Sequence, residues 1–392
     1  MIRKFWIVGL KYAVTVAAIY FLFSSGRLRF SDLHIARDGW TWIASAALMC
    51  LLFMTLIQVR YWAILRSCGG DFTIWRVLRA GFIAWFFNTS LLGGVGFLSG
   101  DAIRAAYLMR GNNRKTTIVG ATLLDRFIGI AGLLTLPTLA LVVGWNCSAT
   151  YFEGSRTIAV FYGLFVAAGL SSLLFFVALA WGRLTAVATW AVAGGTGFFW
   201  LARIPDSTSE AAGWIFIPLV VALVAPVLLP GGRLQKSLNR WGQPGKVLND
   251  LISTVVEFRR RPGTLSCAWL LSVAIHFLWM TGVFFSAQAI VIPVAPTFMQ
   301  VWFAAPPANA TNILPLPASG LGIGETAFDT LLRLCTGPGG ATVVGGAAAY
   351  LTFRIVMMLT ALSGAPVYLA SGKSGPWKKT GGEGSNSAGE ES

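Results

Sequence analysis

The chain has 392 residues, of which 56% are hydrophobic and 11% are charged, with a formal net charge of +15. This composition excludes a soluble globular protein and indicates an integral membrane protein. The basic residues lie between long apolar stretches instead of forming one domain, so we expect them to orient the chain and expect no nucleic-acid partner.

Eight apolar segments are long enough to cross a hydrocarbon core of about 30 Å, which takes about 20 helical residues. Arg60, Arg66, Arg76 and Arg79 mark one cytoplasmic loop, and the basic stretch 231–263 marks another. We predict a polytopic membrane domain over residues 1–370, with both termini in the cytoplasm. The predicted spans are 5–23, 40–59, 116–144, 157–181, 186–202, 213–230, 264–290 and 341–370.

Two segments do not fit as simple crossings. The charge markers agree only if residues 81–115 enter and leave on the cytoplasmic side and residues 298–340 do so on the outer side. We therefore predict two re-entrant hairpins in an all-α membrane protein. The halves 40–144 and 264–370 then form inverted-topology repeats.

Both hairpin segments carry the same glycine-rich motif, which ends in a carboxylate. Irregular backbone is tolerated inside a membrane only against protein or a watery cavity, and paired interruptions are typical of transporter sites. The motif residues are Asn88, Gly96, Gly100 and Asp101, which recur at the same spacing as Asn312, Gly320, Gly324 and Glu325. The predicted hairpin-turn residues are Gly96, Gly100, Pro315, Pro317, Gly320, Gly322 and Gly324.

Each motif leads into an apolar segment that carries an arginine, Arg126 or Arg354. Charged side chains within a membrane usually face a partner or a cavity, and the planar fork of arginine can hold two phosphate oxygens. We predict that these two arginines bind an anionic head group. Arg104, Asn88 and Asn312 are predicted as further substrate contacts.

Asp101, Asp125 and Glu325 are predicted coupling or ion-pair residues, which either orient the arginines or carry a proton. Other interpretations stay open for the same residues. The carboxylates of Asp101 and Glu325 could cap helices, and the two arginines could form structural ion pairs with them. Arg104 could snorkel to the cytoplasmic interface, and the two asparagines could satisfy broken backbone.

The remaining segments predict no catalytic centre. Five dispersed cysteines and two histidines give no metal-ligand spacing, so we expect neither metal nor cofactor. Residues 231–263 contain an amphipathic basic connector, either interfacial or packed on the bundle. Residues 371–392 are polar and are predicted to be disordered.

Two short motifs carry a resemblance to a known family. They are Ser99, Gly100, Asp101 and Arg104 followed by Asp125 and Arg126, and Leu314 to Pro317 followed by Gly320, Leu321, Gly322 and Glu325. With these motifs the chain resembles the flippase-like domain family, also called the lysylphosphatidylglycerol synthase transmembrane region. The first copy departs from the family because it has Leu91 to Gly94 where a proline is usual.

The resemblance implies movement of a phospholipid or lipid-linked head group between leaflets of a bacterial or archaeal cytoplasmic membrane. In the multiple peptide resistance factor, a fused member, an aminoacyl-transfer domain follows the membrane part. Only a short polar tail follows Ser371 here, so we expect no lipid aminoacylation.

We therefore interpret the chain as a lipid translocase, either a flippase or a scramblase, with an anionic cargo. One alternative is a membrane enzyme that modifies lipids or transfers sugars, which would need more carboxylates than the loops offer. The other is a non-transporting scaffold, which would need larger loops.

The inverted-repeat arrangement predicts a labelling pattern. In a chain whose native cysteines are replaced by alanine, Gly94→Cys should react with a membrane-impermeant maleimide from the cytoplasmic side. Pro317→Cys should react from the outer side. Labelling of both positions from one side would contradict the arrangement.

Overall fold

The computed structural model describes residues 16–89, 98–110, 115–143, 261–292, 294–311, 321–334 and 344–371, and also residues 13, 169 and 242. Every regular element in these ranges is helical, apart from an isolated antiparallel bridge between Ile35 and Ile290. Four of the described helices are long and apolar enough to cross a membrane: Gly39–Ser67, Lys115–Pro137, Gly263–Ala289 and Gly346–Ala370. The predicted all-helical membrane class is confirmed at this level.

Four predicted spans match these helices, namely 40–59, 116–144, 264–290 and 341–370. The spans at 157–181, 186–202 and 213–230 lie almost entirely outside the described residues. The same holds for the connector at 231–263, the tail at 371–392 and most of the span at 5–23.

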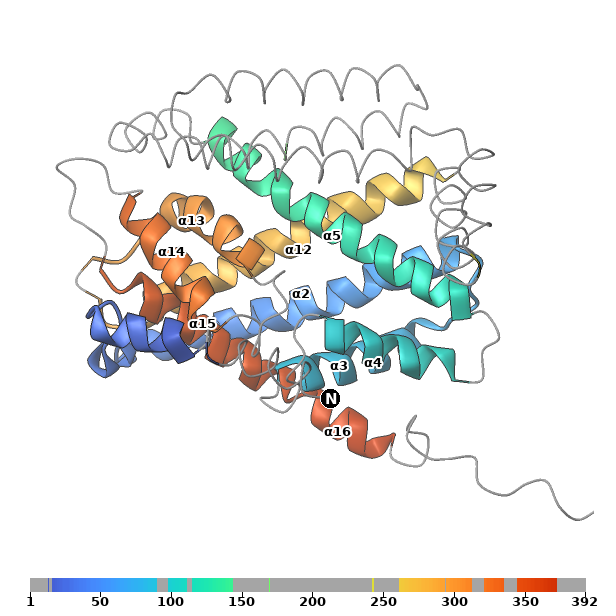
Figure 1. The fold of residues 1–392 in the computed structure, drawn as a ribbon, viewed down its shortest axis with the longest axis horizontal. Coiled ribbons are helices and arrows are strands. Elements are labelled where there is room, and N and C mark those ends of the chain that lie inside the picture. Colours follow the sequence, from blue (N-terminus) through green and yellow to red (C-terminus); the bar gives the residue numbers. More distant parts are fainter. Residues whose placement is uncertain are drawn as a thin grey trace, which may run out of the picture.

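Helices α2 (Gly39–Ser67) and α12 (Pro262–Ala289) form the centre of the fold. They make the most extensive helix contact among the described elements and cross the middle of Figure 1. They run antiparallel, since the N–H of Ala36 donates to the carbonyl of Ala289 at 2.9 Å. The chain thus places the start of α2 beside the end of α12.

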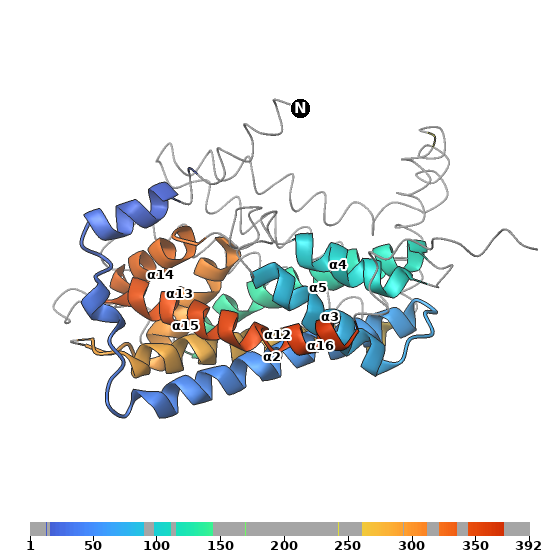
Figure 2. The same ribbon diagram turned by 90° about the horizontal axis from the view of Figure 1, so that it is seen from below.

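Two pairs of shorter helices accompany this centre. Helix α3 (Ile74–Thr89) packs on α4 (Leu98–Met109), and α13 (Phe298–Ala310) packs on α14 (Ile323–Leu334). The first pair begins earlier than the predicted residue 81. The two pairs lie toward opposite ends of the long axis in both ribbon views (Figures 1 and 2).

The turns that would connect each pair lie outside the described residues. Gly96, Asn312, Pro315, Pro317 and Gly320 lie outside the described residues. Whether each pair is a re-entrant hairpin stays a prediction.

A longer helix follows each pair and completes the core. Helix α5 (Lys115–Val143) crosses α12, as Figure 1 shows, and α15 (Gly346–Ala361) is continued by the short α16 (Gly364–Ala370). Helices α5 and α12 approach each other closely at Gly132, where an added Cβ would overlap Ser272. The order α2, α3, α4, α5 is therefore repeated as α12, α13, α14, α15.

Candidate functional site

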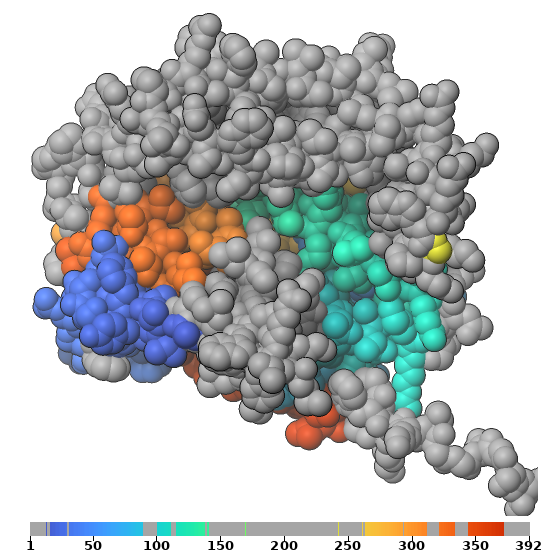
Figure 3. All heavy atoms as spheres, viewed as in Figure 1, coloured from blue at the N-terminus to red at the C-terminus, as the bar shows by residue number. Residues whose placement is uncertain are grey.

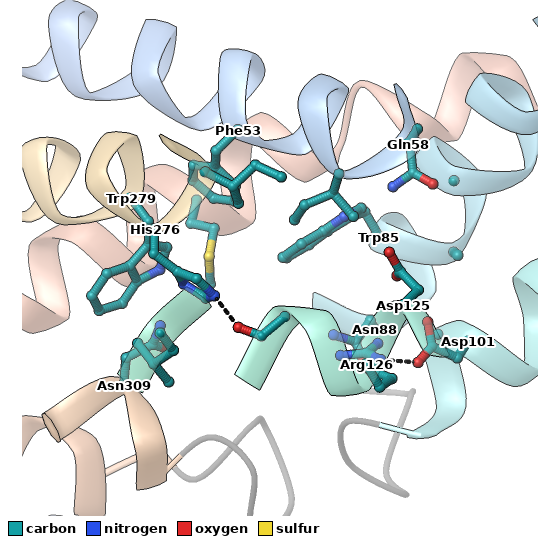
Figure 4. A pocket seen from close by; sticks show the side chains of 18 of the residues that line it. Phe53, Gln58, Trp85, Asn88, Asp101, Asp125, Arg126, His276, Trp279 and Asn309 are labelled. Carbon is teal, nitrogen blue, oxygen red and sulfur yellow. Dashed lines mark hydrogen bonds and ion pairs between the residues drawn. The ribbon is translucent and has the colours of Figure 1, made fainter. Parts of the chain in front are cut away.

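A cavity of about 190 Å³ lies between the two repeated sets of helices. Arg126 of α5 and Arg354 of α15, the two arginines predicted to bind the head group, both line it. Figure 4 shows Arg126 close to Asp101, with His276 and Asn309 at the other end of the cavity. Side chains that lie far apart in sequence thus share one hollow.

Five charged side chains in and beside this cavity form an alternating series, which we call the arginine–aspartate chain. Arg60 Nε lies 2.8 Å from Asp125 Oδ1, and Arg104 Nη2 lies 3.2 Å from Asp125 Oδ2. Arg104 Nη2 also lies 3.0 Å from Asp101 Oδ1, and Asp101 pairs in turn with Nε of Arg126. Each aspartate is therefore shared by two arginines, which leaves the series with a net positive charge.

Neutral partners complete the inner part of the series. Arg60 Nη1 donates to Ser272 Oγ at 2.9 Å, which ties α2 to α12. Arg104 Nη1 donates to Gln58 Oε1 at 3.3 Å, and its guanidinium carbon lies 3.7 Å from the centre of the Tyr61 ring. The Arg104 side chain is only 3% exposed, so the snorkelling interpretation of this residue is wrong.

The second half has a smaller charge group. Arg354 Nε lies 3.0 Å from Glu325 Oε1, and Glu325 Oε2 accepts from the N–H of Gly322 at 2.6 Å. Gly322 adopts a positive φ of 89° at the start of α14, a conformation that favours glycine. Both structural roles considered for Glu325, the ion pair and the cap, are therefore present.

Glycines make room for these charged groups. A Cβ added at Gly324 would lie 2.8 Å from Arg354 Nη2, and one added at Gly100 would lie 3.0 Å from Cβ of Asn88. Asn88 also lines the cavity. The prediction of Gly100 and Gly324 as hairpin-turn residues is wrong, because both lie in the first turn of a helix, α4 or α14, where they allow close approach of these side chains.

Arg60 was placed wrongly by the sequence interpretation. It was assigned to a cytoplasmic loop after a span ending at residue 59, but α2 continues to Ser67 and Arg60 is 5% exposed. The signal was available, because apolar residues continue beyond Arg60 to Leu65 before the next arginine. Charge counting failed because a buried arginine and a loop arginine look alike in sequence.

His276 is a second cavity residue that the sequence analysis did not identify. Its Nε2 lies 2.9 Å from the carbonyl of Gly129, and its buried Nδ1 has no hydrogen-bond partner within the described part of the chain. A lone histidine in an apolar helix gave no sequence signal for this position.

The arginines differ in how far a ligand can reach them. The Arg126 side chain is 29% exposed, whereas those of Arg60, Arg104 and Arg354 are 3% to 5% exposed. Arg126 is therefore the most accessible of the four arginines that line the cavity. Within the described residues no group of three or more His, Cys, Asp or Glu side chains could hold a metal ion.

Comparison with known proteins identifies the family. A family model described as the lysylphosphatidylglycerol synthase TM region matches residues 8–364. No curated protein and no solved structure matches the chain.

The shared position of Asp125 predicts a large effect of its removal on stability. Asp125→Asn should lower the free energy of unfolding by about 3–5 kcal/mol, because it leaves Arg60 and Arg104 without a buried carboxylate. Denaturant titration in detergent micelles measures this. Asp71→Asn, at an exposed position, is the control and should stay within about 0.5 kcal/mol of the parent. Equal stability of both variants would contradict the structural role.

Proposed function

The chain belongs to the lysylphosphatidylglycerol synthase TM region family, and on that premise we propose that it moves an anionic phospholipid or lipid-linked head group between membrane leaflets. The observation that supports this most is the composition of the cavity. Four arginines and two aspartates line it, contributed by both halves of the chain. A phosphate group matches this excess of guanidinium groups.

The shared aspartate offers a way for Arg126 to accept a phosphate at low cost. Leaving a buried charge unpaired costs about 3–5 kcal/mol. Asp101 has Arg104 as a second partner at 3.0 Å, so it stays paired when Arg126 turns to a ligand. Arg126 is then the entry contact of the cavity.

Arg354 is the second contact in this proposal. Its side chain is 5% exposed and belongs to the other repeat, so a head group reaches it only after entering the cavity. When Arg354 binds the head group, Glu325 keeps the Gly322 amide as a hydrogen-bond donor. Each carboxylate thus retains a partner during the exchange.

We further propose that the chain lies in a bacterial or archaeal cytoplasmic membrane. Its two halves would then be inverted repeats, and both termini would lie in the cytoplasm. The positions of the helix pairs at opposite ends of the molecule support this (Figures 1 and 2). Two basic residues, Arg76 and Arg110, lie together at the α3–α4 end of the molecule. Arg76 Nη2 donates to the carbonyl of Arg110 at 2.6 Å. Basic residues favour the cytoplasmic side.

This proposal predicts that the cavity arginines are required for lipid movement. Arg126→Gln and Arg354→Gln should each slow the movement of fluorescent phosphatidylglycerol in proteoliposomes by at least about tenfold, since a hydrogen bond to a charged group contributes about 1.5–3 kcal/mol. Arg79→Gln, at an exposed position on α3, is the matched control and should behave like the parent. Full activity of both cavity variants would remove these arginines from the site.

The roles of Asp101 and Glu325 are tested by measuring lipid movement in the same vesicles with and without an imposed pH gradient. We expect Glu325→Gln to impair movement more than Asp101→Asn, because Asp125 remains beside Arg104 when Asp101 is neutralised. If both variants keep a gradient-dependent rate equal to the parent's, neither acid carries a proton.

A scaffold would tolerate both substitutions without change in its partner binding, and a lipid-modifying enzyme would form a new lipid product.

A further inference from the structure

A second hollow lies apart from the central cavity, between the N-terminal residues 18–21 and helices α13 and α14. It has a volume of about 420 Å³ and shares no lining residue with the central cavity. We call it the α14 groove. Figure 3 shows the N-terminal segment, in blue, against the orange atoms of this helix pair.

The walls of the α14 groove suit a hydrocarbon chain. Ala18, Ala327 and Leu331 are among its apolar lining residues. The hydroxyl of Thr326 donates at 2.6 Å to the carbonyl of Gly322, the residue just before α14. This wall hydroxyl already has an acceptor, so it does not need one from a ligand.

A cationic rim adjoins the groove. Arg27 Nη1 donates to Thr330 Oγ1 at 2.8 Å, and its guanidinium carbon lies 5.5 Å from the centre of the Phe21 ring. Phe21 and Thr330 both line the groove. Arg27 therefore contacts both of its walls.

A second arginine belongs to the same rim. Arg333 Nε lies 2.8 Å from Asp329 Oδ2, and Arg27 Nη1 lies 3.8 Å from the same oxygen. The two guanidinium groups are thus neighbours around one carboxylate. Asp329 is fully buried and also accepts from the N–H of Ala347 at 3.4 Å.

The charge of the rim is not balanced by Asp329. The Arg27 and Arg333 side chains are 31% and 28% exposed, whereas the single carboxylate is covered. The accessible part of the cluster is therefore positive, and one phosphodiester would balance it. A free phosphate would match the rim but would leave the apolar groove unused.

We propose that the α14 groove binds an anionic diacyl phospholipid, with an acyl chain along the groove and the phosphate at Arg27 and Arg333. This site is separate from the central cavity and does not depend on lipid movement through it.

Site-specific photocrosslinking tests the proposal. Phe21, which is 46% exposed, is replaced by benzoylphenylalanine in the full chain, and Leu48 on α2, which is 52% exposed, is replaced in a control chain. Both are reconstituted in vesicles of phosphatidylcholine and phosphatidylglycerol, and the crosslinked lipid is identified by mass. We expect phosphatidylglycerol to be several-fold enriched over its bulk fraction at position 21 and not at position 48.

Charge variants then assign the enrichment to the rim. Arg27→Gln or Arg333→Gln should return the lipid at position 21 to the bulk composition, whereas Arg37→Gln, at an exposed position in the same N-terminal region, should not. Bulk composition at position 21 in the parent chain overturns the proposal, even if the charge variants fail to fold. Enrichment that persists in both rim variants also overturns it. Because Arg126→Gln should leave the enrichment intact, failure of the transport proposal is distinguishable from failure of this one.

Discussion

The structure depends on one constraint, which is that an arginine buried in an apolar bundle must be met by a carboxylate. The arginine–aspartate chain satisfies it with fewer acids than bases, because Asp125 and Asp101 are each shared by two arginines. The same contacts join α2, α4 and α5, and Ser272 extends them to α12. The position of the first helix pair is therefore fixed by the groups that also give the cavity its positive charge. In the proposed function, the charge that holds the helices together is also the charge that attracts the head group.

Small residues are the second condition for this arrangement. A Cβ added at Gly81 would overlap the carboxamide of Gln58, whose oxygen accepts from Arg104. A Cβ added at Gly129 would lie 3.4 Å from Arg60 Nη2, and the carbonyl of the same glycine lies 2.9 Å from His276 Nε2. The glycines thus admit long polar side chains between helices, and they also expose backbone carbonyls to them. Their contribution to function is indirect but specific to the charged network.

Helix α14 links the two polar regions of the second half. Glu325 in its first turn pairs with Arg354, which lines the central cavity, and Asp329, one turn later, pairs with Arg27 and Arg333 at the rim of the α14 groove. Residues four apart lie on neighbouring positions of one helix face. A shift of α14 would consequently move both carboxylates together. One helix thus carries both the carboxylate that pairs with Arg354 and the carboxylate at the rim of the proposed lipid groove.

The sequence by itself determined the membrane class, the four described spans and the repeated motif. It also offered, as one interpretation, the pairing of Asp101 with Arg126 and of Glu325 with Arg354. These follow from hydropathy and from the high cost of a lone charge in apolar sequence, both of which can be read along the chain. Only the tertiary structure decided that Arg60 and His276 belong to the same cavity as the predicted Arg104 and Asp125, and that Arg27 and Arg333 meet at Asp329. The reason is that these contacts join residues distant in sequence. An arginine in a loop and an arginine in a site are the same residue type, and only burial in the folded chain distinguishes them. Arg60 shows the difference, since its neighbours in sequence placed it at a membrane surface and its neighbours in space place it in the core.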